Sequence, residues 1–250
     1  METVLAALTE QHTELDALLS PLDHKGWARP TRCEGWDVAD VVLHLAQTDE
    51  LAIASAELRV NEQLGSLGGP EHDNTVDEGA ADMVALERGR PHAALLLRWR
   101  DGASLLRAVL GASDPHQRVQ WVAGKLSIHT LCATRLSECW IHTGDVAGAL
   151  GVEQEVTDRL EHVARLAWRT LPYAFARAGR ELQGPVEFDL RAPSGARWHF
   201  VPEGEPVTRV EGDGAELCLV AARRVTPDET SLRATGPDAD AVLECVRTYA

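Results

Sequence analysis

The spacing of hydrophobic residues changes once along this 250-residue chain, close to Pro185. Before that point, leucine, valine and alanine recur every three to four residues, which is the period of helices with one buried face. After it, short segments alternate hydrophobic and polar residues, as strands with one buried face do. A run of helices followed by a small sheet with helices indicates the α+β class. We therefore expect a helical domain over residues 1–180 and a small α+β domain over residues 181–250.

The first domain is expected to consist of long helices separated by clear breaks. Pro21 ends the first helix, because proline lacks the amide that a helix needs, and the Asp37 side chain caps the start of the second. Glycines and a proline within residues 65–74 predict a mobile connector. The predicted helices are residues 5–19, 38–62, 90–110, 127–150 and 157–179.

The second domain is expected to contain a small sheet covered by helices. Alternating segments separated by turn residues such as Pro193-Ser194-Gly195 indicate strands. The predicted strands are residues 186–190, 197–201, 207–210 and 232–234, and the predicted helices are residues 215–223 and 238–247.

An excess of acidic residues, 39 Asp and Glu against 24 Lys and Arg, gives the chain a net charge of −15. Nucleic acids and anionic membranes bind clusters of Lys and Arg, and the sequence contains no basic run. No apolar stretch approaches the roughly 18 residues of a membrane span, and no signal-peptide pattern begins the chain. Five scattered cysteines without a C-x-x-C pair argue against a disulfide framework. We expect a cytoplasmic protein that acts on a small molecule, with no nucleic-acid or membrane partner.

A glutamate and two histidines stand out as possible ligands of one metal ion. Glu138 and His142 are four residues apart, so on a helix they lie one turn apart on the same face. His44 interrupts an apolar stretch and should face the interior of the helical domain, where its nitrogens need partners. Two imidazoles and one carboxylate suit zinc or another divalent metal. The alternatives are a solvated Glu–His pair and a core histidine that bonds to a carbonyl or a buried acid.

Three segments resemble a known family over nearly the whole chain. Residues 30–46 (PTRCEGWDVADVVLHLA) and residues 138–151 (ECWIHTGDVAGALG) are similar to the two metal-binding motifs of the mycothiol-dependent maleylpyruvate isomerase family, a branch of the DinB-like metalloproteins. Residues 186–248, with LCLVAARR at 217–224, resemble that family's C-terminal domain. The sequence looks closest to an actinobacterial subgroup that is described only as metal-binding.

The resemblance implies a DinB-like four-helix bundle that carries a divalent metal, usually Zn²⁺, on His44, Glu138 and His142. It also implies a small sterol-carrier-like α+β domain at the C-terminus. The best-known members use a low-molecular-weight thiol, mycothiol, to isomerise, open or conjugate an electrophile. By the same resemblance, Arg224 would face the cleft between the domains and bind a substrate carboxylate, which suits a guanidinium. Arg223 could take that role through a shift of one residue, or Arg224 could be a surface residue.

Asp145, three residues after His142, could orient the imidazole, accept a substrate proton or lie on the helix surface. Cys139 follows Glu138 directly and therefore points about 100° away from it on a helix, so we expect no direct role for its thiol. Trp36 is interpreted as a packing anchor rather than a substrate wall. Among the other histidines only His129 shares the helix of the expected ligands.

The leading interpretation is an enzyme, a metal-dependent and mycothiol-dependent isomerase or S-transferase for a small electrophilic metabolite. A thiol-independent metalloenzyme of secondary metabolism, which would use Lewis acidity or metal-activated water for hydrolysis, cyclisation or elimination, is the first alternative. A protein that binds a metal or ligand without turnover is the second. The sequence leaves the substrate and the oligomeric state open.

Overall fold

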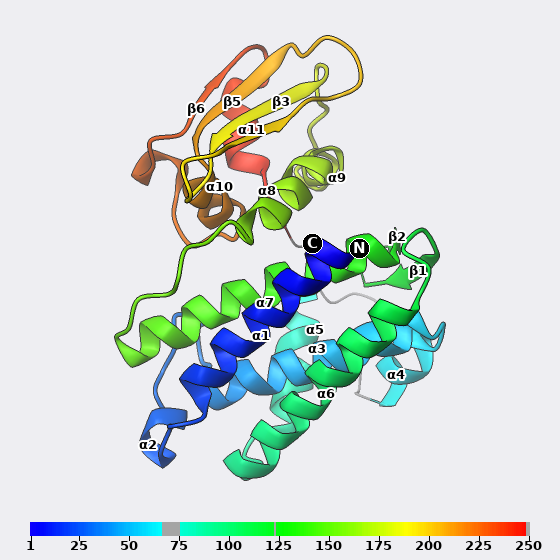
Figure 1. The fold of residues 1–250 in the computed structure, drawn as a ribbon, viewed down its shortest axis with the longest axis vertical. Coiled ribbons are helices and arrows are strands. Elements are labelled where there is room, and N and C mark those ends of the chain that lie inside the picture. Colours follow the sequence, from blue (N-terminus) through cyan, green and yellow to red (C-terminus); the bar gives the residue numbers. More distant parts are fainter. Residues whose placement is uncertain (67–75, 123, 249–250) are drawn as a thin grey trace. The chain divides into compact units, whose positions relative to one another are not determined.

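The computed structural model describes residues 1–66, 76–122 and 124–248. Its first part is a bundle of four long helices, in which α1 packs against α6 and α7, and α3 packs against the same two helices (Figure 1). The four helices are α1 (Glu2–Leu19), α3 (Val38–Ala56), α6 (His92–Ala112) and α7 (Ile128–Leu150). The core between them contains Leu15, Leu45 and Trp99, each at most 1% exposed. The four-helix bundle predicted from the sequence is therefore confirmed.

Shorter elements connect the bundle helices. They are α2 (His24–Trp27), α4 (Val60–Ser66), α5 (Val76–Glu87) and a hairpin of β1 (Arg118–Trp121) and β2 (Gly124–Ser127). The prediction of one helix over residues 38–62 was wrong, because α3 ends at Ala56 and Leu58 adopts a left-handed backbone with φ of 62°. Neither α5 nor the hairpin was predicted. From residue 67 on, the expected connector at residues 65–74 lies outside the described residues.

The C-terminal part is a four-stranded sheet in the order β4-β3-β5-β6 with helices packed on it. The central pair β3–β5 is parallel, whereas β3–β4 and β5–β6 are antiparallel. One face of the sheet buries hydrophobic side chains such as Phe188, Phe200 and Val210, as the alternation in the sequence predicted. The elements are α8 (Leu160–Arg169), α9 (Leu171–Arg177), β3 (Val186–Arg191), β4 (Arg197–Phe200), β5 (Thr208–Asp213), α10 (Gly214–Ala221), a 3₁₀ turn (Pro227–Glu229), β6 (Arg233–Thr235) and α11 (Ala239–Cys245).

The chain separates into two compact units, Met1–Gln154 and Glu155–Ala250. The sequence analysis placed the boundary near residue 180, some 25 residues further on. The difference arises because α8 packs against α10, and α9 against α11, so both helices join the sheet unit. The predicted helix over residues 157–179 is also divided, since Pro172 begins a separate helix, α9.

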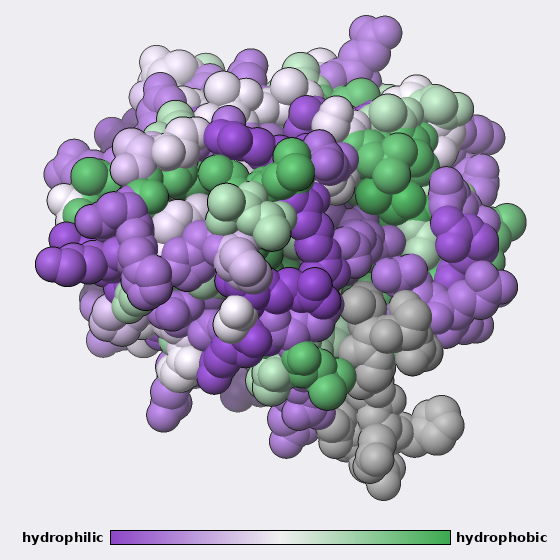
Figure 2. Space-filling view, turned by 90° about the horizontal axis from the view of Figure 1, so that it is seen from below, coloured by the Kyte–Doolittle hydropathy of each residue, from purple (hydrophilic) through white to green (hydrophobic). Residues whose placement is uncertain are grey.

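Hydrophilic residues interrupt the hydrophobic ones on the face shown in Figure 2. Among the described residues, none of the helices combines the length and the hydrophobicity that a membrane crossing requires. All five cysteines are free thiols, and four of them are buried.

Candidate metal centre

His44 lies in the middle of α3, whose start is fixed by a reciprocal cap. The Asp37 side chain accepts from the amide of Asp40 at 2.9 Å, and the Asp40 side chain accepts from the amide of Asp37 at 3.3 Å. Such a capping box satisfies amides that the first turn of a helix leaves unpaired. The cap fixes the residue at which α3 begins and therefore which residues face the bundle. His44 is one of them, and only 6% of its surface is exposed.

Glu138, His142 and Asp145 lie on one face of α7, at helical spacings of four and three residues. Ser127 caps the start of α7 by accepting from the amide of Thr130, and Gly151 ends the helix in the left-handed conformation, with φ of 73°. The helix is thus continuous through the whole segment and stacks the three side chains above one another.

The structure brings His44 of α3 together with Glu138 and His142 of α7. The Nε2 atom of His44 lies 2.8 Å from Oε1 of Glu138, and Nε2 of His142 lies 3.4 Å from the same oxygen. One ligand atom from each of the three residues lies within 4.8 Å of the others, and both histidines are buried. Such a convergent, shielded set of two imidazole nitrogens and one carboxylate oxygen can hold one divalent cation.

Protons are unequally distributed over this group. Burial raises the pKa of the Glu138 carboxyl, but hydrogen bonds from His142 and His44 outweigh burial and hold that pKa well below its ordinary value. Burial also lowers the pKa of His44. For His142, burial lowers the pKa, but contacts with Asp145, Cys33 and Glu138 raise it well above the usual value. These directions favour an ionised Glu138 and a neutral His44, the states in which both groups can donate an electron pair, whereas His142 has to lose a proton before its Nε2 atom can do so.

Asp145 lies behind His142, on the side away from Glu138. The Nδ1–H group of His142 donates to Oδ2 of Asp145 at 2.9 Å, and Asp145 is 1% exposed. Asp145 therefore does not lie on the helix surface, which was one of the alternatives considered from the sequence. A carboxylate on the second ring nitrogen fixes the tautomer and the orientation of an imidazole.

Two residues of the loop before α3 also reach this group, which the sequence analysis did not anticipate. The thiol of Cys33 lies 3.3 Å from Oδ2 of Asp145. The Trp36 ring lies beside both imidazoles, with centroids 5.1 Å from His44 and 6.5 Å from His142. Both residues lie within the motif of residues 30–46, but in a loop. A loop has no regular spacing of buried residues, so these contacts could not be predicted from the sequence.

A buried ion pair lies about one helical turn from the three clustered residues and was also missed. The Arg135 guanidinium of α7 contacts Asp49 of α3 at 3.0 Å, and it donates to the Thr48 hydroxyl at 2.9 Å. The two charged side chains are only 2% and 3% exposed. Asp49 lies 86 residues from Arg135 in the chain, so the local sequence contains no pattern from which this pair could be predicted.

Three further residues considered from the sequence do not belong to the groups of converging ligand atoms found among the described residues. Cys139 is buried, and burial raises its pKa. His129 is half-buried in the first turn of α7, about two and a half turns before Glu138. Arg224 lies in the second unit just beyond the end of α10, and its guanidinium donates to the carbonyl of Ala222 at 3.1 Å.

Comparison with known proteins places the chain in a family. Residues 8–147 match the model of the mycothiol maleylpyruvate isomerase N-terminal domain. The chain belongs to this family. The matched region contains His44, Glu138, His142 and Asp145, and it covers the whole helical bundle except the ends of α1 and α7.

Relatives and solved structures extend the likeness beyond the matched domain. Two uncharacterized proteins, Rv0036c and MT0041, from two strains of Mycobacterium tuberculosis are each 31% identical to this chain and cover 98% of it and 95% of their own length. The crystal structure of a mycothiol-dependent maleylpyruvate isomerase aligns with a TM-score of 0.62 at 18% identity, over 95% of each chain. A histidine-to-alanine variant of that isomerase gives 0.61. The α+β fold, a helical bundle followed by a small sheet domain, is thus confirmed for the whole chain.

Proposed function

We propose that this protein is a metal-dependent and mycothiol-dependent enzyme, an isomerase or S-transferase that acts on a small electrophilic metabolite in the cytoplasm. The observation that carries the proposal is the convergence of His44, Glu138 and His142 from two helices of the bundle. Family membership supports an isomerase as the class of enzyme. The name of the structurally similar enzyme supports mycothiol as the cosubstrate. Free thiols throughout the chain agree with a reducing compartment.

His44, Glu138 and His142 are of the residue types that bind divalent cations, and both histidines are buried. Two imidazoles with one carboxylate are a ligand set that catalytic zinc sites use, and they leave a coordination position for another group. Nε2 of His44 pairs with Glu138, whereas its buried Nδ1 atom has no hydrogen-bond partner among the described residues, so the hydrogen bonds account for only one of the two ring nitrogens. When bound, a cation such as Zn²⁺ supplies Lewis acidity and lowers the pKa of a thiol or of water.

The chain's own side chains would position and shield the reaction. Asp145 holds the ring of His142 through Nδ1, and the Trp36 ring lies beside both imidazoles. The nucleophile is the sulfur of the cosubstrate rather than that of Cys139, since burial raises the pKa of Cys139 and keeps its thiol protonated. We assign binding of a substrate carboxylate to Arg224.

The proposed chemistry is thiol addition. The sulfur of mycothiol forms a C–S bond to one carbon of an activated alkene and the thiol proton goes to the neighbouring carbon, so the double bond becomes a single bond that can rotate. Elimination then breaks the C–S bond, removes a proton from the neighbouring carbon and restores the double bond with the opposite geometry, so that the thiol is regenerated. If elimination does not follow, the product is a thioether conjugate. Isomerase and S-transferase activity therefore differ only in the last step.

The test is turnover by the zinc-loaded protein against a panel of activated cis-alkenes and epoxides, with and without mycothiol. We expect turnover only when mycothiol is present, and loss of that turnover in His142→Ala. His129→Ala is the matched control, because it removes a histidine of the same helix outside the cluster. Turnover that is independent of mycothiol would contradict the proposal and favour a thiol-independent metalloenzyme. Binding of zinc without any turnover would favour a binding protein.

A further inference from the structure

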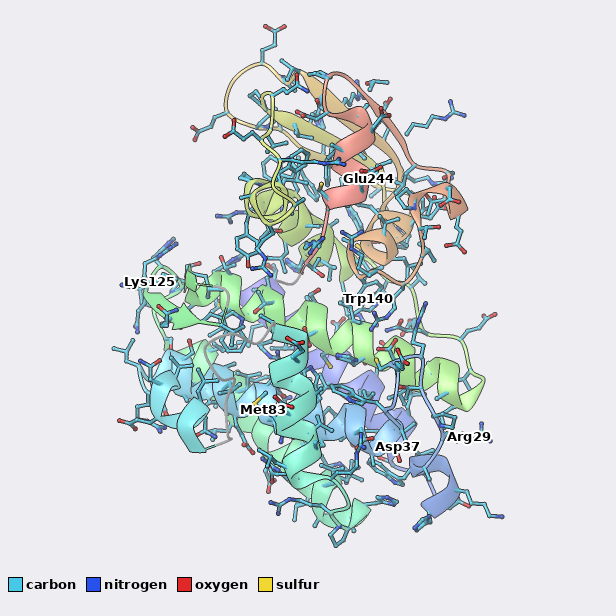
Figure 3. The ribbon with its side chains drawn as sticks, turned by 180° about the vertical axis from the view of Figure 1, so that it is seen from behind. Arg29, Asp37, Met83, Lys125, Trp140 and Glu244 are labelled. Atoms are coloured by element: carbon cyan, nitrogen blue, oxygen red, sulfur yellow. The ribbon has the colours of Figure 1, made fainter. Side chains whose placement is uncertain are left out.

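The loop between α2 and α3 is fastened to the end of α7. Within the loop, Pro30 and Asp37 form a β-bridge, so its two ends lie side by side. The Arg29 guanidinium donates to the carbonyl of Ala149 at 3.1 Å, near the C-terminus of α7. Arg29 and Asp37 are labelled in Figure 3, where this loop can be followed beside the bundle. The loop is thereby held against the helix that carries Glu138 and His142.

Inside this loop, the Cys33 thiol contacts the carboxylate of Asp145, which also accepts a hydrogen bond from His142. Oδ2 of Asp145 accepts from Nδ1–H of His142 at 2.9 Å, and the thiol of Cys33 lies 3.3 Å from the same oxygen. Cys33, His142 and Asp145 form a cluster of their own, with one polar atom of each within 4.8 Å of the others. Cys33 is half-buried, and the Asp145 side chain is 0% exposed.

The chemistry of these groups assigns the direction of the hydrogen bonds. An ionised carboxylate only accepts, so both the thiol and the imidazole nitrogen must donate to it. A carboxylate oxygen offers two acceptor sites, and at Oδ2 one is matched to His142 and the other to Cys33. Loss of either donor removes one of the hydrogen bonds to this buried carboxylate, which is then less firmly held.

We propose that Cys33 is a positioning residue of the centre. Its thiol donates to Asp145 and holds that carboxylate in the place where it orients the imidazole of His142. The sulfur–oxygen contact thus connects the loop before α3 to a side chain of α7 that contacts His142. The part of this inference that concerns cation affinity rests on the proposed function, whereas the part that concerns the orientation of His142 does not.

Two substitutions separate hydrogen bonding from packing at this position. Cys33→Val keeps a side chain of similar volume without a donor, and Cys33→Ser keeps a donor in a smaller side chain. Cys132→Val is the matched control, because it removes a buried thiol of α7 that lies outside the cluster. If Cys33 only fills space, Cys33→Val should change the measured properties less than Cys33→Ser. If Cys33 acts as a hydrogen-bond donor, Cys33→Ser should change them less than Cys33→Val.

The first readout needs no metal. In the metal-free protein labelled with ¹⁵N-histidine, we expect the Nδ1 proton of His142 to exchange with solvent at least about threefold faster in Cys33→Val than in the natural protein, because its acceptor is less firmly held. Cys33→Ser and Cys132→Val should leave the rate unchanged. An unchanged rate in Cys33→Val, or equal acceleration in Cys33→Ser, would overturn the proposal.

The second readout is the dissociation constant for Zn²⁺, measured by competition with a chromogenic chelator. A direct partner of a ligating imidazole typically changes metal affinity by about 10- to 100-fold, so the more remote Cys33→Val should weaken it by about 3- to 10-fold. In an Asp145→Ala background, Cys33→Val should have a clearly smaller effect than in the natural protein, because the link through Asp145 is gone and only the contact of Cys33 with His142 remains. Additive losses would contradict the proposal. If the natural protein binds no Zn²⁺, the proposed function fails and proton exchange alone decides the role of Cys33.

Discussion

His142 has a carboxylate at each of its ring nitrogens. Nε2 faces Glu138 at 3.4 Å, and Nδ1 donates to Asp145 at 2.9 Å. His44 differs, because Nε2 faces Glu138 whereas Nδ1 has no partner among the described residues. A carboxylate behind a ligating imidazole makes the ring more basic and fixes its orientation. We therefore expect the affinity of the centre to depend on Asp145 as well as on the three candidate ligands.

Asp145→Asn tests this dependence. The amide keeps the shape of the carboxylate but removes its charge, so we expect Zn²⁺ affinity to fall by about 10- to 100-fold. Competition with a chromogenic chelator measures the change. Glu153→Gln, a change of the same kind at an exposed residue after α7, should have no effect. Equal affinities of the natural protein and Asp145→Asn would show that Asp145 does not act on the centre.

Two buried cysteines, Cys132 and Cys218, should be inert near neutral pH. Burial raises the pKa of Cys132 to about 12 and also raises the pKa of Cys218. Thiolate is the reactive form, and at pH 8 it is about 10⁻⁴ of a thiol with a pKa near 12. We expect iodoacetamide at pH 8 to leave both residues unmodified in the folded protein and to label them after denaturation, as measured by mass spectrometry. Rapid labelling of either in the folded state would contradict their assignment as inert core residues.

How far the site could be predicted from the sequence depended on helical periodicity. Glu138, His142 and Asp145 share one helix, so their spacing alone placed them on one face, and His44 was identified by its apolar neighbours. Cys33 and Trp36 lie in a loop, where the backbone path depends on bonds such as the one from Arg29 to α7. Such long-range bonds leave no pattern in the local sequence, and the contacts of these two residues could not be predicted.

The pairing of α3 with α7 depends on a buried ion pair close to the centre. Arg135 contacts Asp49 at 3.0 Å and donates to the Thr48 hydroxyl, which itself donates to the carbonyl of His44 at 2.8 Å. Through Thr48, Arg135 of α7 is therefore connected to the backbone of His44 in α3. This connection holds the two helices together close to the point where His44 faces Glu138.

Asp49→Ala should destabilise the protein by about 3–5 kcal/mol, because it leaves the Arg135 guanidinium buried without a counter-charge. The double variant Asp49→Leu with Arg135→Met removes both charges and should be less destabilised than the single one. Chemical denaturation followed by circular dichroism measures the free energy of unfolding. If the double variant were the less stable of the two, the cost would come from packing rather than from an unpaired charge.

Single elements were predicted from the sequence where a local cause fixes them. The cap at Asp37 and the glycine at 151 mark real helix ends, because each satisfies backbone groups that a helix leaves unpaired. The end of α3 at Ala56 was missed, since neither glycine nor proline stands near it and Leu58 adopts φ of 62°. Residues 118–121 alternate in burial as a strand does, but that segment was too short to be assigned from the sequence.

At the scale of the whole molecule, the two units carry different parts of the proposed function. The candidate ligands all lie in Met1–Gln154, whereas Arg224 lies in Glu155–Ala250. A net charge of −15 opposes the binding of a carboxylate substrate unless a positively charged side chain attracts it. If Arg224 is that side chain, its loss should weaken substrate binding and leave the metal in place.

Arg224→Ala should raise KM for a carboxylate substrate by about tenfold or more, because a hydrogen bond to a charged group contributes about 1.5–3 kcal/mol. Zinc content should stay unchanged. Steady-state kinetics and metal analysis of the same preparations measure both quantities, and Arg223→Ala is the matched control at the neighbouring position. An effect in Arg223→Ala alone would transfer the role to that residue, and no effect in either would remove both from the substrate site.

The central claim is that three side chains from two helices hold one divalent cation. Metal analysis by mass spectrometry of purified protein, after loading with Zn²⁺ and removal of the excess, tests it most directly. The account predicts one zinc per chain in the natural protein and in His129→Ala, and a loss of nearly all zinc in His44→Ala and in His142→Ala with far-UV circular dichroism unchanged. Stoichiometric zinc retained in either of the last two variants would contradict it.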